Sequence, residues 1–202
     1  MQRQVGAHRW LRTLIGTEVT PERDEASEVA RIMCTQRLWQ RLGHAGRPPS
    51  QVAEPLIHGV SLGSWAAKVF RLDRRDLVIA LNERTYLTVV FALAPRREFR
   101  ANFAGAVGDV LKDLRLPQEI VRSESAAIEF EPLARLTNRS MTGTLNDLEF
   151  HCGIELSYHD ELRRVQLNLN EIPHVNRDPC VPVDAVRRLL EAVPVERLLA
   201  IH

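Results

Sequence analysis

Lysine is almost absent from this chain of 202 residues, because only Lys68 and Lys112 occur among its 27 lysines and arginines. The codon usage of a GC-rich genome would explain this bias. Selection for the planar, bidentate contacts of arginine with phosphate or carboxylate is the alternative explanation. Neither sign of charge is in excess, since the formal net charge is +1. A strong overall field that steers the chain to DNA or to an acidic membrane is therefore excluded.

Cysteine pairs and long apolar runs are also missing. The three cysteines, Cys34, Cys152 and Cys180, form no CxxC pair, which excludes a disulfide framework and a zinc ribbon. No apolar run approaches the roughly 18 residues of a membrane span, and the first residues lack the apolar core of a signal peptide. We therefore expect a cytoplasmic protein without membrane association.

The common catalytic and cofactor motifs are absent as well. The chain has no GxxxxGK[ST], GxGxxG or HExxH string. Residues 59–63 match G-x-S-x-G, but they lie in a proline-rich loop before a strand and not between a strand and a helix. His151 and His159 would stand about 12 Å apart along one helix, too far to share a metal ion. We expect no cofactor and no metal site, and whether the chain is an enzyme stays open.

What is present is the composition of a globular protein, with 45% hydrophobic and 26% charged residues. Residues 1–28 combine a short amphipathic piece with an acidic stretch, and we expect them to form a flexible N-terminal extension. Residues 29–202 carry periodic apolar patterns and are long enough for one domain with its own core.

The periodicity predicts an α+β fold. Alternating and β-branched runs separated by short turns predict an antiparallel meander. Apolar residues at helical spacing predict helices, which we expect on one face of a sheet of three to five strands. Strands are expected at 29–34, 65–72, 77–81, 86–93 and 126–130. Helices are expected at 35–42, 95–114, 117–122, 140–158, 184–190 and 195–201, with Thr35 and Ser140 as the caps of the first and the fourth. Residues 161–170 fit either a helix or a strand.

The densest polar cluster stands where a helix is expected to begin. Hydroxyl, amide and arginine side chains at a helix N-terminus can bind an anion together with free backbone N–H groups. The same residue types also simply cap helices. The candidate binding residues in this segment are Thr137, Asn138, Arg139, Ser140, Asn146 and Asp147.

Asn82 and Arg84 form a second candidate set at the turn before residue 86. Asparagine there is also typical of turn chemistry. A basic patch is a third possibility, although solvated surface explains the same residues. Its members would be Arg71, Arg74, Arg75, Arg96, Arg97 and Arg100.

Four short motifs together resemble an uncharacterised bacterial family, a domain of unknown function. They are Met33-Cys34-Thr35-Gln36-Arg37-Leu38, Gly63-Ser64-Trp65-Ala66-Ala67-Lys68, Leu81-Asn82-Glu83-Arg84-Thr85 and Thr137-Asn138-Arg139-Ser140-x-x-Gly143-x-x-Asn146-Asp147. The resemblance covers about residues 31–192 and departs at Thr144-Leu145, where a Ser-Met pair is expected. It implies that the two polar segments matter together, and it implies no activity, cofactor or catalytic residue.

Three hypotheses about function follow. The first is a binding module for a protein or nucleic-acid partner. The second is an enzyme that holds a phosphate or carboxylate substrate at residues 137–147, with Arg139 as the clamp. The third is a structural subunit that docks through residues 1–28. The positions of Arg139, Asn146 and Asn82 should separate the first two, because an active site requires them to converge in one pocket.

Overall fold

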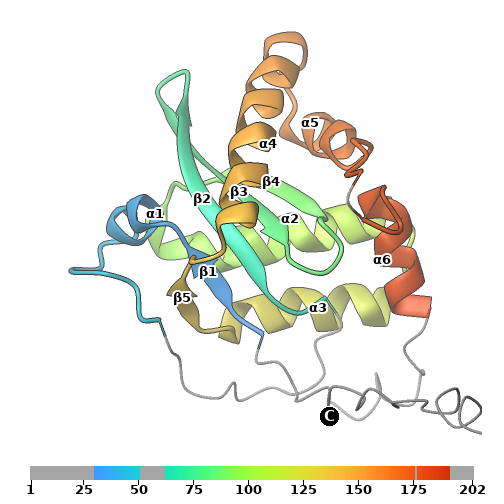
Figure 1. Ribbon diagram of the computed structural model, residues 1–202, viewed down its shortest axis with the longest axis horizontal. Coiled ribbons are helices and arrows are strands. Elements are labelled where there is room, and N and C mark those ends of the chain that lie inside the picture. The colour runs from blue at the N-terminus through green and yellow to red at the C-terminus, as the bar shows by residue number, and fades with distance from the viewer. Residues whose placement is uncertain (1–29, 51–61, 176, 192–202) are drawn as a thin grey trace, which may run out of the picture.

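The computed structural model describes residues 30–50, 62–175 and 177–191 (Figure 1). The expected extension at 1–28 and the expected helix at 195–201 lie outside the described residues. The described chain forms one five-stranded sheet in the order β4-β3-β2-β1-β5. Its strands are β1 (Ile32–Cys34), β2 (Trp65–Leu72), β3 (Arg75–Asn82), β4 (Thr88–Ala92) and β5 (Leu133–Arg135).

The central part of the sheet is the expected antiparallel meander, because β3 pairs antiparallel with both β2 and β4. Asp73 and Arg74 form the tight turn between β2 and β3, with φ angles of 44° and 65°. Positive φ at both central residues matches the right-handed twist of a hairpin, although glycine or asparagine is the usual choice there.

The prediction of an antiparallel sheet is wrong for the other two strands, so the sheet is mixed. β1 lies between β2 and β5 and runs parallel to both. Residues 133–135 were not expected to form a strand at all. A three-residue strand shows no periodicity, and its pairing with residues 32–34 depends on contacts about a hundred residues away in the chain.

Helices cover both faces of the sheet, and the prediction of helices on one face is wrong. The helices are α1 (Gln36–Arg41), α2 (Phe99–Asp113), α3 (Gln118–Phe130), α4 (Arg139–Tyr158), α5 (Leu162–Leu169) and α6 (Pro182–Glu191), and a 3₁₀ turn, η1 (Arg96–Glu98), precedes α2. Residues 126–130 belong to α3 and not to a strand, because Ala127 and Ile128 continue the helical spacing of Ile120 and Val121.

Two apolar cores explain this layered arrangement. Trp65, Ala67 and Val69 of β2 pack into one core with residues of α1, α2, α3 and α6. The alternate residues Ala66 and Phe70 pack into a second core with residues of α4 and α5. β3 therefore faces a core on both sides, which explains its continuous apolar run over residues 77–81. None of the helices in the described ranges is long and apolar enough to cross a membrane.

Short side-chain caps set the starts of two helices that follow parallel strands. Thr35 Oγ1 accepts a hydrogen bond from the Leu38 amide at 3.4 Å and begins α1, as expected. Asn138 Oδ1 accepts from the Met141 amide at 3.2 Å and begins α4. The expected cap at Ser140 is wrong, because the cap lies two residues earlier, at Asn138, and Ser140 is already inside the helix.

Candidate functional site

The carboxyl ends of β1 and β5 lie side by side, at what we call the carboxyl edge of the sheet. α1 follows β1 and packs on the face that carries Trp65, since Leu38 belongs to that core. α4 follows β5 and packs on the opposite face, through Met141 and Leu145. The two connections therefore diverge from neighbouring parallel strands. In open sheets such a divergence leaves a crevice outside the strand ends where ligands bind.

The first candidate segment lies at this edge. Thr137, Asn138, Arg139 and Ser140 are all exposed. Asn138 caps α4, and its carbonyl accepts a hydrogen bond from Thr142 Oγ1 at 3.0 Å. The guanidinium of Arg139 has no partner among the described residues, so it is free to meet a ligand. Asn138 thus caps the helix, while the neighbouring Arg139 side chain is exposed.

Asn146 and Asp147 lie further along α4 and are exposed. Asn146 Oδ1 accepts a hydrogen bond from Lys68 Nζ at 2.5 Å, and the same ammonium pairs with Glu149. Lys68 projects from β2 on the face covered by α4, so this contact holds the helix against the sheet. Asn146 thereby acquires a positioning role that the sequence motif did not indicate.

The second candidate set lies at the other end of the sheet. Asn82 pairs with Trp65, the first residue of β2, and is fully buried. Its Nδ2 donates to the carbonyls of Leu62 and Ser64, at 2.9 and 3.2 Å. Its Oδ1 accepts from the amides of Arg84 and Thr85 and from the Thr85 hydroxyl. Asn82 thus joins a turn to the start of β2, and the structure does not bring it near Arg139.

Arg84 is exposed on the same turn and lies against Gly63. Gly63 has a φ of 72°, and a Cβ built there would stand 3.2 Å from Arg84 Cδ. Arg84 therefore packs across the turn that Asn82 organises. The two polar segments of the sequence occupy opposite ends of the parallel strands.

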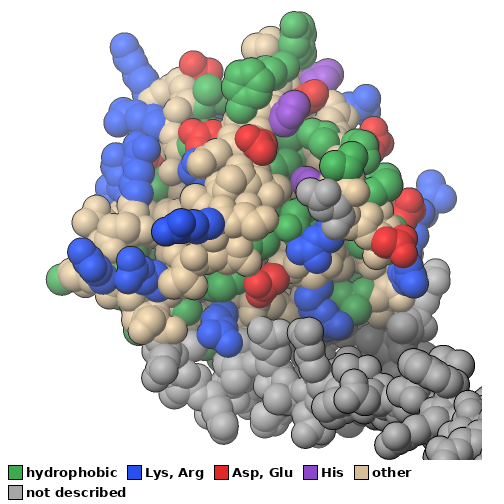
Figure 2. Space-filling model, viewed as in Figure 1, with side chains coloured by type: hydrophobic (Ala, Val, Ile, Leu, Met, Phe, Trp, Pro, Cys, Tyr) green, Lys and Arg blue, Asp and Glu red, His purple; other side chains and the backbone are tan. Residues whose placement is uncertain are grey.

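Arginines gather around the carboxyl edge. β2 continues past the end of β1 for residues 68–72, about 16 Å at the usual rise, so the β2–β3 hairpin projects beyond this edge. An ion pair of 3.0 Å between Arg41 and Asp76 joins α1 to the hairpin. Figure 2 shows many lysine and arginine side chains on the side where Figure 1 draws α1 and the hairpin.

We call the exposed arginines of this region the arginine edge. None of them forms an ion pair with an acidic side chain within the described part of the chain. They are Arg37, Arg47, Arg71, Arg74, Arg75, Arg135 and Arg139.

The arginine edge includes only half of the basic patch considered from the sequence. Arg100 is partly buried and donates to the carbonyls of Ile128 and Glu131, at 3.0 and 2.7 Å. Arg97 pairs with the neighbouring Glu98. Arg71, Arg74 and Arg75 instead lie on the hairpin that projects beyond the carboxyl edge, where Arg37 and Arg139 stand in the first turns of α1 and α4. No local pattern could have shown this grouping, because it depends on the parallel pairing of β1, β2 and β5.

The sequence pattern did not indicate one buried carboxyl group, that of Glu131. Glu131 is 3% exposed, and neither of its side-chain oxygens has a hydrogen-bond partner. Burial, and then the nearby Glu124, raise the pKa of Glu131 to about 8, although Arg100 opposes the shift. Glutamate is rarely buried without a partner, so this carboxyl is an unusual titratable group.

Thiols and histidines can serve as metal ligands and as nucleophiles. No group of three metal-ligating side chains occurs within the described ranges. Burial raises the pKa of both Cys34 and Cys152 to about 12, so neither is a reactive thiolate. Cys180 is exposed.

The fold and the site together define a small α+β domain, as predicted, with a mixed five-stranded sheet, a basic edge and no recognised catalytic motif. Comparison with protein families assigns residues 31–185 to a domain of unknown function, DUF6933. The match spans more than half of the chain, so the chain belongs to this family, as the motifs in the sequence indicate. No curated protein matches the chain.

Proposed function

We propose that this protein is a nucleic-acid-binding module that contacts phosphates through the arginine edge. The observation that carries the proposal is the gathering of exposed arginines without acidic partners in a chain whose net charge is only +1. Guanidinium groups bind phosphate oxygens in bidentate geometry, and such contacts supply most of the sequence-independent affinity for nucleic acids.

The conformation of Arg74 supports this proposal. Its φ of 65° lies in the left-handed region, where glycine is favoured and an arginine side chain costs energy. The residue stands at the tip of a hairpin that projects from the domain. A two-stranded ribbon of this kind has dimensions suited to the major groove of a duplex. An exposed charge kept at an unfavourable backbone position is more useful for contact with a partner than for stability.

The alternative of an enzyme at residues 137–147 receives less support. Arg139, Ser140 and Asp147 are exposed on the first turns of α4, and Asn82 lies at the far end of the sheet. An exposed array suits contact with an extended partner better than enclosure of a small substrate.

Salt-dependent binding tests the proposal. The full chain should bind a labelled 20-base-pair duplex, measured by fluorescence anisotropy, with log K falling linearly against log salt. Replacing both Arg74 and Arg139 by alanine should reduce the magnitude of the salt slope by about 2, since each lost phosphate contact removes about 0.9.

A double variant of Arg122 and Arg187, two exposed arginines on α3 and α6, is the matched control and should keep the original slope. Single-stranded DNA and RNA of the same length are tested in parallel to identify the preferred form. Binding that does not change between about 50 and about 200 mM salt, or equal slopes in both double variants, would contradict the proposal.

A further inference from the structure

The free edge of β4 is covered along most of its length by amide side chains. β4 is the outermost strand, and the backbone N–H and C=O groups of Thr88, Val90 and Ala92 point away from β3. Asn170 serves both groups of Thr88, with two hydrogen bonds of 2.7 Å. These contacts replace a neighbouring strand and protect the edge from unwanted pairing.

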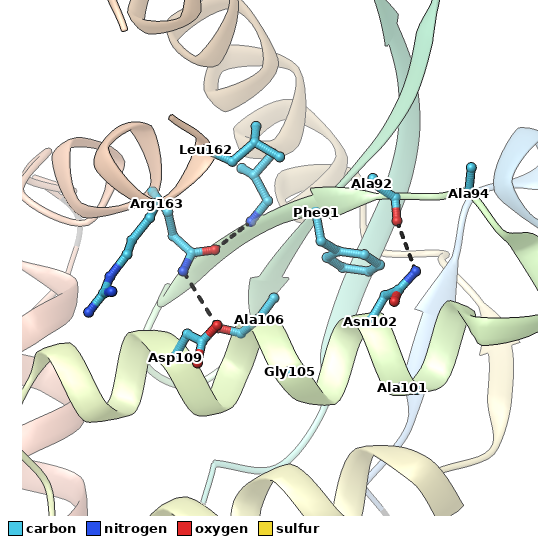
Figure 3. A pocket seen from close by; sticks show the side chains of 12 residues that line it. Phe91, Ala92, Ala94, Ala101, Asn102, Gly105, Ala106, Asp109, Leu162 and Arg163 are labelled. Atoms are coloured by element: carbon cyan, nitrogen blue, oxygen red, sulfur yellow. Dashed lines mark hydrogen bonds between the residues drawn. The ribbon is translucent and has the colours of Figure 1, made fainter. Parts of the chain in front are cut away.

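Two further amides continue this cover from opposite sides. Gln166 of α5 accepts from the Val90 amide at 2.8 Å, and Asn102 of α2 donates to the Ala92 carbonyl at 3.3 Å. Both hydrogen bonds are drawn in Figure 3. The Val90 carbonyl and the Ala92 amide lie between these two hydrogen bonds and also point away from β3. Neither has a hydrogen-bond partner in the described part of the chain.

This open pair faces a pocket of about 390 Å³ between β4, α2 and α5. In Figure 3 α2 passes on one side of β4 and contributes Ala101, Gly105 and Ala106, while Leu162 comes from α5 on the other side. The small side chains of α2 create the space, because a Cβ built on Gly105 meets no atom within 4 Å. The volume lies in the range of pockets that hold small ligands.

The two open groups select one alignment of a ligand backbone. In a parallel ladder, each residue of one strand lies opposite a partner residue of the next strand. Its N–H donates to the carbonyl of the residue that precedes the partner, and its C=O accepts from the amide of the residue that follows the partner. Those positions around Phe91 are the Val90 carbonyl and the Ala92 amide. An antiparallel partner would reach these two groups only through two different residues. Each of those residues would also face the Val90 amide or the Ala92 carbonyl, which Gln166 and Asn102 occupy. A second parallel residue would need the Ala92 carbonyl, which Asn102 occupies.

We propose that this pocket binds a single extended amino-acid residue, aligned parallel to β4, with its N–H on the Val90 carbonyl and its C=O on the Ala92 amide. An acylated amino-acid amide and an internal residue of a short peptide both present this pair of groups. An apolar side chain suits the alanine and glycine floor of the pocket. The proposal is independent of the arginine edge.

The test is a titration of the ¹⁵N-labelled full chain with N-acetyl-leucine methylamide, followed by backbone amide resonances. Binding in the millimolar range should shift the Ala92 and Gly105 amides in a saturable manner. The matched probe carries a methyl group on the leucine nitrogen and lacks the N–H for Val90. It should bind about tenfold more weakly, the loss expected for one hydrogen bond left unmade.

A pair of variants separates the pocket from the rest of the surface. Gly105→Leu fills the floor of the pocket and should weaken binding at least about tenfold. Gly143→Leu is the control, because Gly143 is also an exposed helical glycine with open space around it but lies on α4. Both changes favour the helix, so both variants should fold.

A blocked tripeptide with central leucine distinguishes the source of the ligand. If it binds as the amide does, the pocket accepts residues of a peptide chain; if only the amide binds, the ligand is a free small molecule. Absence of saturable binding by both would overturn the proposal. Equal affinity for the N-methylated probe, or unchanged binding by the Gly105→Leu variant, would do the same.

Discussion

Replacing Glu131 by glutamine removes the unpaired carboxyl at the C-terminal end of α3. The native carboxyl is 3% exposed and lacks hydrogen bonds to both oxygens, and burial raises its pKa to about 8 from 4.5. A raised pKa means that the native state binds the proton more tightly than the unfolded chain. The contribution of this group to the free energy of unfolding is therefore largest at low pH and decreases as the pH rises from about 4.5 to about 8.

The magnitude follows from the difference between the two pKa values. At pH 7 the carboxyl is ionised in the unfolded chain and still protonated in the native state. Each pH unit above 4.5 therefore lowers the free energy of unfolding by about 1.4 kcal/mol. The free energy of unfolding should thus be about 3 kcal/mol lower at pH 7 than without this carboxyl. Glu131→Gln keeps the shape and the neutral state, and should recover about this amount at pH 7 and almost nothing at pH 4.5.

Urea unfolding of both proteins between pH 4.5 and pH 8, followed by tryptophan fluorescence, measures this difference. Subtracting the two curves cancels the other titrating groups. Glu129→Gln is the matched control, because Glu129 lies two residues earlier on α3 and is exposed. It should leave the pH dependence unchanged. If the two curves for Glu131→Gln and the natural chain stay parallel across this range, the reasoning about the buried carboxyl is wrong.

Four further outcomes are expected. Asn82→Ala should lower the free energy of unfolding by about 3 kcal/mol, since it leaves buried carbonyls and amides without partners, and a loss below about 1 kcal/mol would contradict this role. Asn170→Ala should expose the Thr88 amide and speed its hydrogen exchange, which would otherwise stay slow. Arg74→Gly should raise stability by about 0.5–1 kcal/mol while weakening duplex binding, and a loss of stability would refute the account of the hairpin turn. Cys180 should react with a thiol reagent in the native chain, whereas the two buried thiols should react only after unfolding.

The sequence predicted the elements with strong local patterns. Alternation and short turns indicated the β2–β3–β4 meander, and the helical spacing of Phe99, Phe103 and Val107 indicated α2. The polar motif at residues 137–147 correctly marked the start of a helix, with Asn138 as its cap in place of Ser140. Whether its residues bind a partner stays a prediction.

Other features depended on distant contacts. β5 is too short to show a period and becomes a strand by pairing with β1. β1 lies within the strand expected at residues 29–34, but its parallel pairing with β2 and β5 was not expected. Asn82 was a candidate binding residue, although asparagine in a turn is also typical of turn chemistry. The structure shows its hydrogen bonds to Leu62, Ser64 and Thr85, which join segments that the local sequence pattern does not connect.

The sequence by itself determined the family, the meander, the principal helices and the excess of arginine over lysine. The tertiary structure decided which arginines lie together, that helices cover both faces of the sheet, and that Val90 and Ala92 face a pocket. The physical reason is the distance along the chain over which each kind of interaction acts. Hydrophobic period, caps and turns act between neighbouring residues and can be recognised in a linear pattern. Parallel pairing, the divergence of α1 and α4 and the burial of Glu131 arise only when segments far apart in the chain pack against one another.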